Sequence, residues 1–199
     1  MRTVEVDVPG HDRWFVLPLD GDVDVTAAEV VNQQLAAGTG QDAREDAIAD
    51  VAGHSRLARQ GAEAAAQEGV DTLGALMLIP GDGTLVGGPV AMLRVMQMPP
   101  EATADDALEL LVDLQGERYG ELTIDELDTA SGPALSVRVR PVVEVDGERE
   151  VHEHRVVFWA RPELEVLVAL SLYTVDLMQG GQAAEPLLSI ARSVAWHPA

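Results

Sequence analysis

Three residues that could ligate a metal ion alternate along one stretch of the chain. Glu150, His152 and His154 stand two positions apart, so in a strand their side chains would project from the same face. Two imidazoles and a carboxylate form a reasonable ligand set for a borderline metal ion. A predicted hairpin over 135–158 places them near a solvent-exposed tip, however, and no further histidine follows nearby in sequence. We therefore expect half-exposed strand histidines here and no metal site.

Much other catalytic chemistry is excluded by residue types that the chain lacks. Its 13 Lys+Arg residues are all arginine, and it has no cysteine. Without lysine there is no Schiff-base nucleophile, no pyridoxal-phosphate anchor and no P-loop lysine. Without cysteine there is no thiolate catalysis, no disulfide and no cysteine-ligated metal centre.

Nucleophile and phosphate-binding motifs are also missing. No serine lies in a G-x-S-x-G motif. The glycine-rich segments 81–83 and 87–89 lead into predicted strands, whereas phosphate-binding loops lead into the N-terminus of a helix. We therefore expect a turn and a bulge there, no catalytic residue and no cofactor, and an enzyme is the less favoured class of protein.

The net charge of −21 limits the partners that the chain can bind. Nucleic acids and anionic membranes attract basic surfaces, so neither is an expected partner. A basic or neutral protein is the expected one, although a charge of this size also serves solubility. Residues 1–7 contain no apolar signal segment and no apolar run is long enough to span a bilayer, so we expect a soluble cytoplasmic protein.

One hairpin is specified by its turn. Asp146-Gly147 suits the two positive φ angles of a type I′ two-residue loop. That loop fixes the register between 135–145 and 148–158, and two of the resulting pairs join opposite charges. The pairs predicted are Glu144–Arg149, Arg140–Glu153, Val139–His154, Val137–Val156 and Leu135–Phe158.

Capping residues and periodicity predict the other elements. Helices are expected over 26–37, 42–68, 103–117 and 182–195, with Thr26 and Thr103 as N-caps of the first and third. Strands are expected over 72–79, 84–98, 121–129 and 164–174, and an opening hairpin joins 3–8 to 14–19.

The nearly continuous apolar run 164–170 is typical of a central strand that is covered on both faces. The chain is therefore expected to form one domain over 1–199 with an α/β fold of the α+β type, a largely antiparallel sheet flanked by helices. Methionines that alternate on strands are expected to fill the core, or alternatively to line a ligand pocket. They are Met77, Met92, Met96 and Met98.

The C-terminal part of the chain resembles a known fold family. Segment 166–172 followed by 187–196, with its closing Trp196, is similar to the last strand and helix of actinobacterial relatives of the Mog1/PsbP-like fold. The resemblance implies an α/β/α sandwich in a bacterial protein. That family includes binding and accessory proteins without a shared catalytic site, so it implies no functional residue. The chain lacks the signal sequence and lipobox cysteine of the lipoprotein members.

Two functions remain from these observations. The favoured one is a non-catalytic accessory or protein-interaction module that uses its acidic surface. The alternative is a small-molecule-binding protein with an apolar pocket between sheet and helices, which requires a cavity of about 300 Å³ or more.

Overall fold

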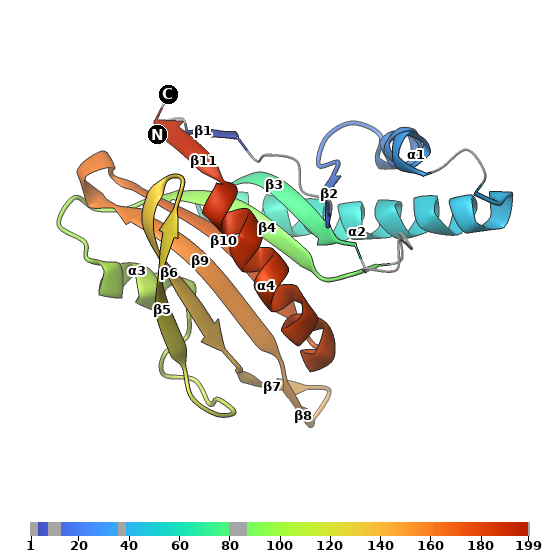
Figure 1. Ribbon diagram of the computed structural model, residues 1–199. Coiled ribbons are helices and arrows are strands. Elements are labelled where there is room, and N and C mark those ends of the chain that lie inside the picture. Colours follow the sequence, from blue (N-terminus) through green and yellow to red (C-terminus); the bar gives the residue numbers. More distant parts are fainter. Residues whose placement is uncertain (1–3, 8–12, 36–38, 80–86, 199) are drawn as a thin grey trace.

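The computed structural model describes residues 4–7, 13–35, 39–79 and 87–198 (Figure 1). The helices are α1 (Val23–Gln34), α2 (Gln41–Gln67), α3 (Ala104–Leu111) and α4 (Leu177–Ser193), with a short 3-10 helix at Pro162–Leu164. The strands are β1 (Val4–Asp7), β2 (Trp14–Leu17), β3 (Asp71–Leu78), β4 (Val90–Gln97), β5 (Thr123–Thr129), β6 (Gly132–Val139), β7 (Val142–Val145), β8 (Glu148–Val151), β9 (Glu153–Arg161), β10 (Val166–Thr174) and β11 (Ala195–Pro198). No helix in these ranges combines the length and the apolar character that a bilayer crossing requires.

Seven strands form one antiparallel sheet in the order β2-β3-β4-β10-β9-β6-β5. β10 is the middle strand, and its residues Leu167, Val168 and Leu170 have no exposed surface. This confirms that the apolar run is a central strand, because only cover on both faces removes successive side chains from water. The expected fold class is confirmed as well.

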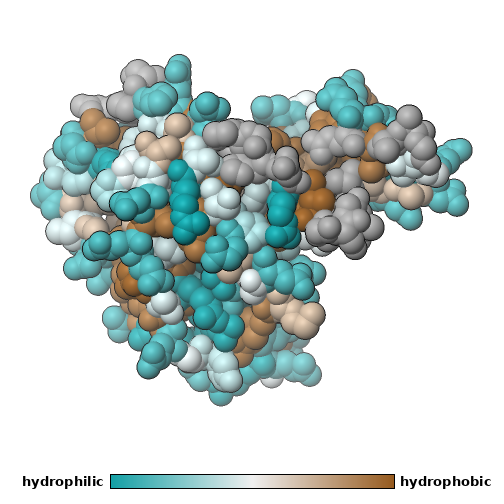
Figure 2. Space-filling view, in the orientation of Figure 1, coloured by the Kyte–Doolittle hydropathy of each residue, from teal (hydrophilic) through white to brown (hydrophobic). Residues whose placement is uncertain are grey.

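Helices cover both faces of this sheet. α4 crosses one face, where its residues Leu187 and Ile190 share a core with Leu170 and Trp159 of the sheet (Figure 1). α2 covers β2 and β3 on the other face, α1 packs against α2, and α3 packs farther along that same face against β9. α1 and the adjoining end of α2 project beyond the sheet, and the outline of the molecule is indented below them (Figure 2).

The Asp146-Gly147 hairpin is confirmed in turn and register. Both residues have positive φ, 53° and 83°, as a type I′ turn requires. Four of the five expected pairs are present as strand pairs, including Glu144 opposite Arg149 and Leu135 opposite Phe158. The fifth, Arg140 with Glu153, lies where the strands are interrupted and is joined by a hydrogen bond of 2.9 Å between Nε and Oε2. The long strands are interrupted near Pro141, so the tip forms the separate two-stranded sheet β7-β8.

The predicted opening hairpin is wrong. β1 pairs with the C-terminal strand β11, and β2 pairs with β3 at one edge of the large sheet. β2 buries Trp14 and Phe15 on opposite faces, which a two-stranded hairpin cannot do but a sheet with helices on both sides can. The turn expected at 9–12 lies outside the described residues, as does that at 80–83.

Helix ends differ from the sequence prediction where a stronger cap precedes the expected one. α1 begins three residues before Thr26, because the Asp22 side chain accepts hydrogen bonds from the backbone N–H groups of Asp24 and Val25. α4 likewise begins early, behind Asp176. Thr103 caps α3, as predicted, and forms a complete capping box with Asp106, but that helix ends at Leu111. The range expected for α2 is confirmed within one residue at each end.

Candidate functional site

The helices leave a strip of the sheet uncovered on the α2 side. Between the regions covered by α2 and α3, the central strand β10 carries the small side chains of Ala169 and Ser171. Ser171 lies in register between Met92 of β4 and Val156 of β9. Small side chains at this place leave a hollow over the middle of the sheet. We call this hollow the sheet cleft and define it by the residues around Arg94, His154 and Ser171.

The sheet cleft consists of two hollows that share Arg94, His154 and Ser171 as lining residues. One hollow has a volume of ≈ 650 Å³ and extends to Leu111 of α3, and the other has a volume of ≈ 850 Å³ and extends to Tyr173. Ligand pockets typically measure about 300–1,000 Å³. The cleft is therefore large enough for a small organic molecule.

Most of the remaining lining is apolar. Met92 and Met96 of β4 are among the lining residues, and Met77, Met96 and Met98 are buried in the core. The core role expected for the methionines is confirmed for these three, and the ligand-pocket role stays a prediction. The other apolar side chains of the lining are those of Leu57, Ala58, Ala65, Val70, Val90, Leu110, Leu111, Val156, Ala169 and Val175.

Arg94 places a positive charge in this apolar setting. Its Nε atom is buried and has no hydrogen-bond partner among the described residues. Burial lowers the pKa of the guanidinium, and the negative charge of Glu68 raises it in the opposite direction. The guanidinium packs against α2, since a Cβ added to Gly61 would lie 3.9 Å from Nη2. A buried donor without a partner costs free energy, and an acceptor that reached this atom would remove that cost.

His154 is a neutral polar group in the same cleft. Burial, together with the positive charge of Arg94, lowers its pKa from 6.5 to about 4. The imidazole contacts the ring of Tyr173, with the centroids 5.7 Å apart, but it forms no hydrogen bond with any residue in the described ranges. The prediction of a half-exposed histidine is confirmed for His154, whose side chain is partly buried, although it lines the sheet cleft. The pairing of His154 with Val139 across the hairpin was predicted correctly. The strands β4 and β10, which add cover to this histidine, are distant in the sequence, so the hairpin alone did not predict that cover.

The same prediction is wrong for His152, which is only 6% exposed. Its Nε2 lies 3.0 Å from a carboxylate oxygen of Glu150, and its Nδ1 lies 2.6 Å from the hydroxyl of Tyr173. This chain of carboxylate, imidazole and phenol fixes the Tyr173 ring at the rim of the sheet cleft. Burial raises the pKa of Tyr173, so the hydroxyl stays protonated and can donate.

The structure thus brings His152 and His154 together at Tyr173, and Glu150 contacts His152 alone of these residues. Within the described ranges, no three His, Cys, Asp or Glu side chains converge as metal ligands do. That these residues hold no metal stays a prediction. A melting temperature that rises with Zn²⁺ in the wild type but not in His154→Ala would contradict it.

Arg94 is the residue that the sequence analysis missed. It is the one charged residue in the strand β4, whose other members are Val, Ala, Met, Leu and Gln. The charged side chain of an arginine inside such a strand must pair with an acidic group, extend to solvent or bind a ligand. That signal could have identified the position, although not the partner residues on β9 and β10.

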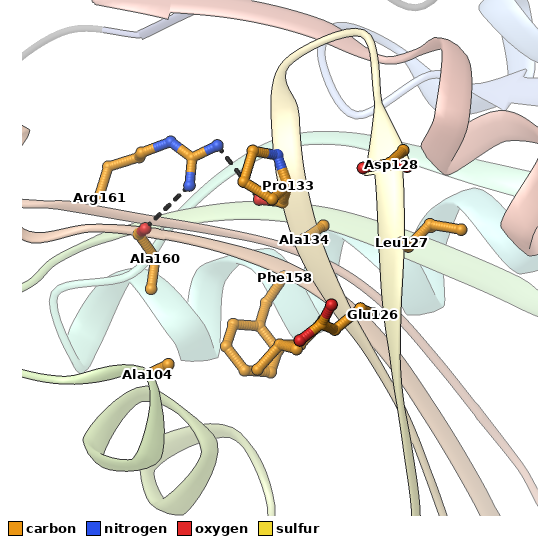
Figure 3. A pocket seen from close by; sticks show the side chains of 10 residues that line it. Ala104, Glu126, Leu127, Asp128, Pro133, Ala134, Phe158, Ala160 and Arg161 are labelled. Atoms are coloured by element: carbon orange, nitrogen blue, oxygen red, sulfur yellow. Dashed lines mark hydrogen bonds between the residues drawn. The ribbon is translucent and has the colours of Figure 1, made fainter.

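A further hollow of ≈ 430 Å³ lies beside α3 at the β5–β6 edge of the sheet (Figure 3). The ring of Phe158 lies at its centre and Arg161 at its rim. Arg161 donates to the backbone oxygens of Ala160, Ser131 and Pro133, so its guanidinium has partners within the protein. The other charged side chains of this lining are those of Glu126 and Asp128, so, among the residues that the structure describes, the hollow has no free guanidinium for an anionic ligand.

Comparisons with protein-family models, with curated proteins and with solved structures found no match to this chain. The resemblance to the Mog1/PsbP-like fold stays a prediction. The function is therefore inferred from the chemistry of the sheet cleft.

Proposed function

We propose that this protein binds a small amphipathic carboxylate in the sheet cleft. One observation carries the proposal: Arg94, His154 and Ser171 share a cleft with mainly apolar walls and make no side-chain hydrogen bond with any residue that the structure describes. Ligand pockets are built in this way, with mostly apolar walls and a few polar groups that fix the orientation of the ligand.

The polar groups suit a carboxylate with a single negative charge. A guanidinium presents its N–H groups in a fork that matches the two oxygens of a carboxylate. The neutral imidazole of His154 has one donor and one acceptor and adds no further charge. The Ser171 hydroxyl can donate a further hydrogen bond. Met92 and Met96 would then contact the apolar part of the ligand, and their flexible side chains adapt to its shape.

The net charge of −21 does not prevent this binding. Salt screens exposed charges beyond about 8 Å at physiological ionic strength, whereas a buried pair is screened much less. Arg94 would therefore set the local potential in the cleft, where the negative charge of Glu68 opposes it.

Calorimetric titration with decanoate and with 1-decanol tests the proposal. The two probes have the same chain length and differ in the charged group. We expect decanoate to bind saturably and more tightly than decanol. Arg94→Gln should weaken decanoate binding by about 10- to 100-fold, because a hydrogen bond to a charged group contributes about 1.5–3 kcal/mol. Arg192→Gln is the matched control, since Arg192 is exposed on α4. Equal affinity for both probes, or unchanged affinity in Arg94→Gln, would contradict the proposal.

The acidic interaction module is the second candidate, and it is favoured by the edge strand β5. Among the strands that the structure describes, β5 pairs with β6 alone, and Asp125, Glu126 and Asp128 are exposed along it. An extended basic peptide could add to this edge as a further strand, with backbone hydrogen bonds and opposite charges.

A fluorescent peptide of alternating Arg and Val residues is a suitable probe for this candidate. Binding measured by anisotropy should weaken between 0.1 M and 1 M salt, and it should be lost when the three β5 carboxylates are replaced by amides. The control variant replaces Asp42, Glu45 and Asp46 of α2 in the same way. An equal loss in both variants would show non-specific attraction and sink this candidate.

A further inference from the structure

On the sheet face opposite the cleft, three arginines surround one buried glutamate. The Glu153 side chain has no exposed surface. Its carboxylate accepts hydrogen bonds from Nε of Arg155 at 2.6 Å, of Arg140 at 2.9 Å and of Arg138 at 3.3 Å. We call these four residues the arginine cluster.

The arginine cluster carries more positive charge than its internal pairing requires. Three guanidiniums and one carboxylate leave two positive charges, in a chain whose net charge is −21. Arg138 and Arg155 are also direct cross-strand neighbours, an arrangement that like charges disfavour. No second carboxylate pairs with these arginines among the described residues. The excess charge is therefore available to an anion from outside the chain.

The geometry of the cluster leaves the terminal N–H groups free to bind. Each arginine uses only its Nε atom on Glu153, and no terminal Nη atom of the three has a hydrogen-bond partner within the described ranges. The side chains of Arg138, Arg140 and Arg155 are 34%, 29% and 17% exposed, so a ligand can reach them. The shared carboxylate holds the three planar groups in place before a ligand arrives.

Helix α4 covers the carboxylate without blocking the guanidiniums. Its residue Gly180 approaches Glu153 so closely that an added Cβ would lie 3.0 Å from Oε1. Burial alone would raise the pKa of Glu153, but the bonds from Arg140 and Arg155 lower it overall, so the carboxylate stays ionised. The negative charge that orients the arginines is thus hidden from solvent, while their outer edges are open.

We propose that the arginine cluster is a binding site for a phosphoryl group, either of inorganic phosphate or of a small phosphate monoester. Arginine forks match phosphate oxygens bidentately, and two excess positive charges match a phosphoryl dianion. The site is separate from the sheet cleft, where one guanidinium faces apolar walls and fits a monoanion.

Calorimetric titration with inorganic phosphate and with phenyl phosphate tests this site, with ionic strength held constant by NaCl. We expect saturable binding. Phenyl phosphate should bind more tightly if the natural ligand is an organic ester. Inorganic phosphate should bind more tightly if the natural ligand is the free ion. Arg138→Gln, which alters the most exposed member, should weaken binding at least about tenfold. The affinity for both probes should be unchanged in Arg192→Gln and in Arg94→Gln. An unchanged affinity in Arg94→Gln would show that the probes bind at the arginine cluster and not in the sheet cleft.

Two results would overturn the proposal. One is the absence of saturable binding of either probe to the wild type. The other is unchanged affinity in Arg138→Gln. Urea unfolding without ligand checks that each variant is folded. If Arg138→Gln does not fold, Arg140→Gln provides a second variant for the same titration.

Discussion

The folded environment changes the properties of the polar side chains in the sheet cleft, which are those of Arg94, His154 and Ser171. Arg94 and His154 are ordinary strand residues in the sequence, yet burial lowers the pKa of both in the folded protein. Tyr173 shows the opposite effect, because burial favours its neutral form and raises its pKa. These shifts follow from the loss of hydration and not from any local motif.

His154 makes stability depend on pH. Its pKa is about 4 in the folded protein and about 6.5 when unfolded, so the unfolded chain binds the proton more readily. Stability should therefore fall as pH drops through 6.5 towards 4, by about 2 kcal/mol between pH 7 and pH 5 from this group alone. Urea unfolding of the wild type and of His154→Gln at both pH values measures this contribution. An identical pH dependence in the two proteins would contradict the assignment.

Removal of the Tyr173 hydroxyl tests the hydrogen-bond chain to His152 and Glu150. Tyr173→Phe leaves a buried nitrogen of His152 without its partner, which should cost about 1–3 kcal/mol of unfolding free energy. Tyr119→Phe is the matched control, because that ring is 61% exposed and its hydroxyl has no hydrogen bond with the described residues. Similar stability changes in the two variants would show that the chain contributes nothing.

Elements with local signals were predicted well, and elements with distant partners were not. The Asp146-Gly147 turn, the Thr103 N-cap and the range of α2 depend on neighbours within a few residues, and all three are confirmed. The pairing of β1 with β11 joins the two ends of the described chain, and no local pattern indicates it. The sheet cleft was not predictable for the same reason, since it exists only where α2 and α3 stop covering β10.

Two glycine-to-alanine substitutions compare the stability effect of a methyl group in the Asp146-Gly147 turn with its effect inside helix α2. Gly147 has a φ of 83°, which costs an alanine about 1–2 kcal/mol, so Gly147→Ala should destabilise the protein. Gly53 lies inside α2 with open space around its Cα, so Gly53→Ala should stabilise it by up to about 1 kcal/mol. Both changes add one methyl group, and chemical denaturation should show opposite signs. A neutral Gly147→Ala would mean that the turn is not held in this form.

At the scale of the whole molecule, an acidic protein keeps arginines in two distinct settings on opposite faces of one sheet. On the α2 side a single guanidinium lies in a cleft with methionine walls, and on the α4 side three guanidiniums share a buried carboxylate. We propose that the first of these settings holds the carboxylate of an amphipathic ligand.

Methionine methyl resonances test this claim most directly, because the chain has only 6 methionines and they report on different places. In protein labelled with ¹³C at the methionine methyl groups, titration with decanoate should shift the signals of Met92 and Met96, which line the cleft. The signal of Met178, which is 74% exposed on α4, should stay in place, and Arg94→Gln should require a higher concentration for the same shifts. Shifts confined to Met178, or no shift of Met92 and Met96 at saturation, would contradict the account.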